Sequence, residues 1–363
     1  MDTLTRDALT VLQPGFTGTT APDWLLRRLG EGLASVGLFG RNIASPEQLA
    51  ALTAALRAER EDVLVAIDEE GGDVTRLEVR TGSSFPGNLA LGAVDDTALT
   101  RAVRRGTGPP ARRLRGQPQL GAVRGRQLRS RQPGHRRAVA RGDPGLVAAH
   151  RRLRRGHAGG GVATCASTSP RHAHTSVDSQ HHDMPRIDVG PRTLEETGAG
   201  ALPGGRRGGT KAVMSAHICC HPSARPAAAA MPRSERCVHG LLHGLLRAHA
   251  RRAGSRFDGL IVTDGMEMRA IADGYGIERG ASWPWPPARR RDLRGGWAGG
   301  RGGRAAVARR GWSGPCGRGE LSEERLAEAR SGCGGWRLGG SARVLPSPPR
   351  PGWGSPPARG RCA

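Results

Sequence analysis

Four polar residues follow short apolar segments and have side chains that can do chemistry. Asp68 ends VLVAID, Asp264 ends GLIVTD, His217 follows KAVMSA, and Arg76 lies a few residues beyond Asp68. A carboxylate can act as a nucleophile or accept two hydroxyl donors, and a guanidinium offers a planar fork of donors. Each residue also has a plainer interpretation. Asp264 could cap the next helix, and Asp68 with Arg76 could form a solvated loop ion pair.

The segments that must position these residues are typical of an α/β protein. Apolar residues spaced three to four apart predict helices over 23–36, from Ser45 onward and over 321–329. Short, fully apolar runs predict strands over 36–43, 63–68, 161–166, 211–218 and 258–264. Because the strands are apolar on both faces, we expect a parallel sheet that is covered on both sides.

Three motifs of this chain resemble those of glycoside hydrolase family 3, in the order in which that family has them. They are AIDEEGGDVTRL (66–77), TSVDSQHHDMPRI (175–187) and DGLIVTDGMEM (258–268). LFGRNI from Leu38 and FPGNLALGA from Phe85 agree with the same family. Within it, the motifs are most similar to the single-domain bacterial β-N-acetylhexosaminidases. The resemblance covers most of residues 8–100 and then shorter parts of the chain up to residue 280.

The resemblance implies a TIM (β/α)8 barrel whose functional groups lie at the C-terminal ends of the strands. It assigns Asp264 as the nucleophile of a retaining glycosidase that cleaves terminal β-linked N-acetylglucosamine. It places Asp68, Arg76 and His217 among the groups that bind the sugar. Glu69 and Glu70 are expected to be structural.

The proton donor implied by the resemblance lies on a loop that departs from the family pattern. The family has a His–Asp dyad, and DSQHH in this chain assigns His181 as the acid/base and Asp178 as its partner. A histidine-rich surface loop without a catalytic role remains an alternative. Ser167 and Thr168 replace the Lys-His pair of the family, and this replacement removes a cation from the expected sugar site.

The charge is concentrated in part of the chain rather than spread over it. The formal net charge is +24, yet residues 1–100 have eight arginines against fifteen acidic residues. Residues 101–155 have seventeen arginines and one acidic residue. Codons compatible with residues 116–141, read one base late, give a sequence that resembles the third barrel strand of the family and the loop that follows it. We therefore expect out-of-frame segments at about 104–142 and within 281–363, and an incomplete barrel.

Two alternatives to an active glycosidase follow from this charge distribution. The first is an inactive, frame-damaged product of a glycosidase gene. The second is an arginine-rich binder of polyanions or nucleic acid, although no aromatic interleaving or DNA-binding motif supports specific recognition. The expected organisation is a barrel over 1–280 followed by an Arg/Gly/Pro-rich tail over 281–363.

Composition also limits the compartment and the cofactors. No apolar run is long enough to span a membrane, and the N-terminus lacks the form of a signal peptide. Seven cysteines, an odd number, favour a reducing compartment, and we expect a cytoplasmic protein. The His217–Cys219–Cys220–His221 cluster does not have the spacing of a structural zinc site. The expected partner is a small carbohydrate, with no cofactor, no metal, no membrane and no specific nucleic acid.

Overall fold

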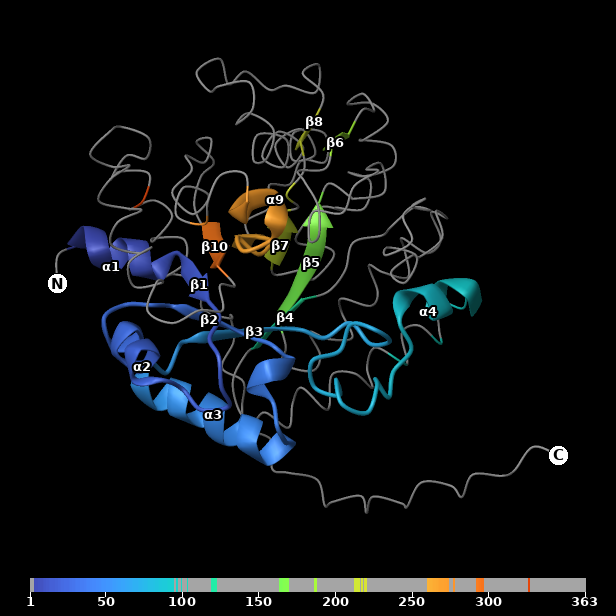
Figure 1. Cartoon of the computed structure of the whole chain (residues 1–363), viewed down its shortest axis with the longest axis horizontal. Coiled ribbons are helices and arrows are strands. Elements are labelled where there is room, and N and C mark those ends of the chain that lie inside the picture. Colours follow the sequence, from blue (N-terminus) through green and yellow to red (C-terminus); the bar gives the residue numbers. More distant parts are fainter. Residues whose placement is uncertain are drawn as a thin grey trace.

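The structure is a computed structural model of the whole chain, in which the N-terminal quarter is described almost continuously (Figure 1). The described residues are 3–94, 96, 99, 103, 119–122, 163–169, 186–187, 212–215, 217, 219–220, 260–273, 277, 292–296 and 326.

Eight parallel strands form one sheet in the order β1-β10-β9-β7-β5-β4-β3-β2. They are β1 (Leu12–Pro14), β2 (Ser35–Leu38), β3 (Leu64–Asp68), β4 (Gln119–Ala122), β5 (Ala163–Ser169), β7 (Ala212–Ser215), β9 (Leu260–Thr263) and β10 (Asp292–Gly296). Two short strands, β6 (Arg186–Ile187) and β8 (Cys219–Cys220), pair separately.

The strand order is the chain order taken around a ring. The first and last strands of the list, β1 and β2, lie next to each other, and Gln13 on β1 donates a hydrogen bond from its side chain to Ser35 on β2. The Ser35 hydroxyl donates in turn to the carbonyl of Leu64 on β3. Eight parallel strands in this cyclic order are the arrangement of a (β/α)8 barrel, so the expected fold class is confirmed.

Two strands lie where the sequence predicted gaps. Gln119–Ala122 pairs with β3 and with β5, in the segment expected to be out of frame. Asp292–Gly296 pairs with β9 and with β1, although the barrel was expected to end at residue 280. The expected loss of these strands is therefore not confirmed, and the sheet extends into the segment expected to be a tail.

The helices of the N-terminal part begin and end where local chemistry dictates. The described helices are α1 (Thr3–Thr10), α2 (Asp23–Gly30), the 3-10 helix η1 (Gly40–Asn42), α3 (Pro46–Glu59), α4 (Asn88–Val94) and α9 (Arg269–Ala272). Ser45 caps α3, because its hydroxyl accepts the backbone N–H of Gln48 at 3.1 Å. The helix predicted over 23–36 ends earlier, and Gly32 then takes a φ of 125°.

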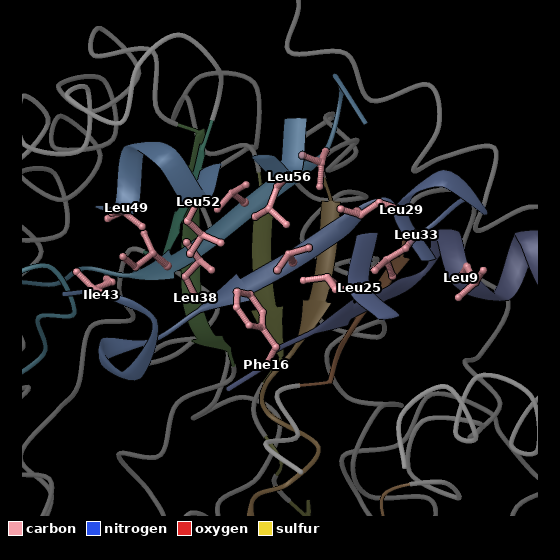
Figure 2. Packing of buried hydrophobic residues seen from close by; sticks show 14 residues of the cluster. Leu9, Phe16, Leu25, Leu29, Leu33, Leu38, Ile43, Leu49, Leu52 and Leu56 are labelled. Atoms are coloured by element: carbon pink, nitrogen blue, oxygen red, sulfur yellow. The ribbon is translucent and has the colours of Figure 1, made fainter. Parts of the chain in front are cut away.

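The main apolar core lies between α2, α3 and the outer faces of β2 and β3 (Figure 2). Leu25 from α2 and Leu56 from α3 are both 0% exposed and point into this layer. Val63, Val65 and Ile67 belong to this cluster, whereas Leu64 and Ala66 belong to a second cluster together with residues of β5, β7 and β9. Alternate residues of β3 thus face the helices and the barrel interior.

Candidate active site

The alternation along the strands decides which side chains reach the mouth of the barrel. On β3, Leu64 and Ala66 face the interior, so Asp68 continues the inward series at the C-terminal end. On β9, Leu260 and Val262 face the interior, so Asp264 continues that series two residues later. Both expected carboxylates therefore lie at the same rim of the barrel. The Asp264 charge also raises the pKa of Asp68, as expected for two carboxylates at one rim.

Asp68 and Arg76 form the expected pair. Nη2 of Arg76 donates to Oδ2 of Asp68 at 3.3 Å, and the two side chains are 30% and 24% exposed. Burial raises the pKa of Asp68 to about 6, Arg76 lowers it, and the charges of Glu70 and Asp264 raise it. Burial therefore changes the pKa of Asp68 more than the ion pair with Arg76 does, which argues against a fully solvated loop pair.

The loop that carries Arg76 is fixed by Glu69. One oxygen of its carboxylate accepts three donors: the Thr75 hydroxyl and the backbone N–H groups of Arg76 and Leu77, at 3.2, 2.9 and 3.0 Å. This confirms the structural role expected for Glu69. Within the described residues, Nε of Arg76 is buried without a hydrogen-bond partner.

Asp264 lies on a short turn after β9 and does not cap the next helix. Its Oδ1 accepts the backbone N–H of Gly265 at 2.8 Å. The N-cap of α9 is Met268, four residues later, so the capping interpretation of Asp264 fails. Asp264 is therefore a partly buried carboxylate at the same rim as the Asp68–Arg76 pair.

His217 is buried against the loop that carries Asp264. It is 0% exposed, and its Nε2 lies 2.9 Å from the carbonyl oxygen of Gly265. A side chain with no exposed surface cannot touch a sugar at the barrel mouth. The expected substrate contact of His217 is therefore not supported by the structure.

The structure adds Phe39, Arg41 and Glu267 to the surroundings of Arg76, and the sequence interpretation had given none of the three a role. Phe39 follows β2 on the interior side, and the guanidinium of Arg41 lies 4.3 Å from the centre of its ring. Arg76 lies over the same ring at 5.9 Å. Burial lowers the pKa of Arg41, the charge of Glu267 raises it, and Arg76 lowers it. The sequence signals for Phe39 were the strand predicted over 36–43 and the LFGRNI motif, which both contain it.

Several expected site residues lie outside the described residues or lack described side chains. His181 and Asp178 are outside them, and Ser167 and Thr168 are described only as part of β5. Within the described ranges, no three His, Cys, Asp or Glu side chains come close enough to hold a metal ion. In the same ranges, none of the helices has the length and apolar character needed to cross a membrane.

An eight-stranded (β/α)8 barrel with acidic side chains and an arginine at one rim is the class of protein to which many glycosidases belong. Residues 23–282 match the family described as glycosyl hydrolase family 3 N terminal domain. The chain belongs to this family. The match runs through the arginine-rich segment 101–155, so it does not favour the frame-damaged alternative.

Relatives and known structures agree with the family. A beta-hexosaminidase of Bordetella avium is 30% identical over 263 residues, which cover 66% of this chain and 67% of the relative. A beta-hexosaminidase of Bordetella pertussis is 31% identical over 51% of this chain and 55% of its own length. A glycoside hydrolase family 3 beta-N-acetylglucosaminidase of Paenibacillus sp. superposes with a TM-score of 0.71 at 25% identity. That alignment covers 92% of this chain and 62% of the other, so the chain spans only about half to two thirds of these relatives.

Proposed function

We propose that the chain is a retaining β-N-acetylhexosaminidase that removes terminal β-linked N-acetylglucosamine from cell-wall or chitin fragments. The observation that carries this proposal is that Asp264 and the Asp68–Arg76 pair lie at one rim of the barrel, where the Asp264 charge raises the pKa of Asp68. The names of the relatives, beta-hexosaminidase and beta-N-acetylglucosaminidase, support the choice of sugar.

In the proposed reaction, a carboxylate oxygen of Asp264 attacks the anomeric carbon, and the bond to the leaving oxygen breaks. The leaving oxygen receives a proton from His181, which Asp178 orients. Water then attacks the glycosyl–enzyme ester and gives its proton back to the histidine, so the β configuration is retained. Asp68 accepts hydroxyl donors of the sugar, and Arg76 donates to its oxygens.

Hydrolysis of a chromogenic N-acetylglucosaminide tests this proposal. Asp264→Ala is expected to lower kcat by on the order of 10⁴-fold or more, because no covalent intermediate can form. Asp273→Ala is the matched control, since this aspartate lies nearby but pairs with Arg269 at the exposed end of α9. Full activity of Asp264→Ala, or no hydrolysis by the parent chain, would overturn the proposal.

The role of His181 as the acid has its own signature. His181→Ala is expected to slow the release of a poor, alkyl leaving group by on the order of 10²–10⁴-fold, because such a group needs protonation. The release of a nitrophenolate, which leaves without a proton, should change much less. Equal losses for both substrates would argue against His181 as the acid.

We also propose a cytoplasmic location. The support is the cysteine content of the sequence, an odd number that favours a reducing compartment. Recovery of the activity mainly from a periplasmic or culture fraction, rather than from the cytoplasm, would contradict this location.

A further inference from the structure

The register of two neighbouring strands brings His217 to the loop that carries Asp264. Strands β7 and β9 pair in parallel, with Ser215 opposite Thr263. Two further residues along each chain put His217 opposite Gly265, and Nε2 of His217 lies 2.9 Å from the Gly265 carbonyl oxygen. The contact joins residues that are 48 positions apart in the sequence.

The protonation of His217 follows from this partner. A carbonyl oxygen only accepts hydrogen bonds, so Nε2 must carry the proton and donate it. Nδ1 is then without a proton, and among the described residues it has no hydrogen-bond partner. Burial lowers the pKa of His217 to about 4, although the backbone hydrogen bonds to Gly265 and Asp264 raise it. The ring is therefore neutral at neutral pH and adds no positive charge beside Asp264.

Both backbone groups of Gly265, the N–H and the carbonyl, form hydrogen bonds. Its N–H donates to Oδ1 of Asp264 at 2.8 Å. Its carbonyl accepts the proton of His217 and also the N–H of Met268, at 3.2 Å, in the turn that leads to α9. A shift of the Gly265 backbone would therefore move the donor that orients the Asp264 carboxylate.

We propose that His217 is a positioning residue that fixes the backbone of Gly265 and, through its N–H, the orientation of the Asp264 carboxylate toward the anomeric carbon. This inference rests on the proposed function of Asp264. His217 acts through the backbone and does not touch the sugar, so its loss should affect the chemical step more than substrate binding.

Two amide variants of different reach test the inference. His217→Gln places an N–H donor near the position of Nε2, whereas the shorter side chain of His217→Asn cannot reach the Gly265 carbonyl. We expect His217→Asn to lower kcat by roughly 10- to 100-fold with KM within about threefold. His217→Gln should stay within about tenfold of the parent chain. Met214→Leu, a volume-conserving change at a buried position of β7, is the control and should leave both constants nearly unchanged.

The readout separates positioning from folding and from the proposed function. Titration of active sites with a mechanism-based fluorosugar gives kcat per competent site, so a partly unfolded variant does not imitate the effect. If His217→Asn does not fold, His217→Leu replaces it as the variant without a donor. A decrease of kcat by more than 100-fold in folded His217→Gln would by itself overturn the inference. Equal losses for Gln and Asn, a change confined to KM, or no change in kcat would also overturn it. Failure of the proposed function would instead appear as an inactive parent chain or an active Asp264→Ala.

Discussion

Asp68 shows how neighbouring charges decide the state of a single side chain. Burial raises its pKa to about 6, Arg76 opposes that shift, and Glu70 and Asp264 add to it. A protonated carboxyl loses acceptor capacity for sugar hydroxyls. We therefore expect kcat/KM to fall as the pH falls below about 6.

The same shift makes the contribution of Asp68 to stability greatest below its ordinary pKa of 3.8, and this contribution is lost as the pH rises through about 6.

Glu70→Gln isolates one of these charges. Removing a like charge should lower the pKa of Asp68, so the acidic limb of the kcat/KM profile should move to lower pH. The pH–rate profile of the parent chain and the variant checks the shift. Glu61→Gln is the control, because Glu61 is exposed before β3, at the opposite end of the strand from Asp68. A limb that stays in place or moves to higher pH would contradict the assignment of Asp68.

At the scale of elements, the site depends on the contact between the loop after β3 and the segment 85–87. Gly71 and Gly72 have φ values of 77° and 60°, in the left-handed region that favours glycine. The N–H of Gly72 donates to the carbonyl of Phe85 at 2.8 Å. A Cβ on Gly72 would lie 2.8 Å from Cα of Gly87, so two backbones approach each other too closely for any side chain.

Gly72→Ala and Gly82→Ala form a matched pair for this contact. Both glycines have a positive φ, but a Cβ on Gly82 meets no atom within 4 Å. Gly82→Ala should lower the free energy of unfolding by about 1–2 kcal/mol from backbone strain alone. Gly72→Ala should cost more and should also raise KM, because the displaced loop carries Arg76. Urea denaturation and steady-state kinetics measure both effects, and equal values for the two variants would refute the backbone contact.

At the scale of the whole molecule, buried polar side chains join the first and second strands of the barrel. Gln13 and Ser35 are 1% and 0% exposed, and their hydrogen bond continues to the Leu64 carbonyl on β3. A buried donor or acceptor without a partner costs about 1–3 kcal/mol, so this chain of bonds favours one arrangement of the three strands. The closure of the barrel is therefore specified by side chains near the N-terminal ends of its strands.

A double-mutant cycle of Gln13→Ala and Ser35→Ala tests this closure. Each single variant should lower the free energy of unfolding, and the coupling between them should be about 1 kcal/mol or more because they share a bond. The Arg269–Asp273 pair, 66% and 58% exposed, is the comparison and should show a coupling below about 0.5 kcal/mol. Denaturant titration of the four proteins measures the coupling, and additive effects at Gln13 and Ser35 would count against the bond.

The sequence by itself determined five of the eight described barrel strands (β2, β3, β5, β7 and β9), the parallel class and the residues that end these strands, because apolar runs are local properties. Asp68 and Asp264 could be found in this way and Arg76 through the family motif, whereas His181 and Asp178 remain predictions beyond the described residues. Only the tertiary structure decided that His217 is buried against Gly265, that Phe39 lies near two arginines, and that the pKa of Asp68 is raised. These properties depend on the strand register and on packing between residues far apart in the chain, which no local pattern contains.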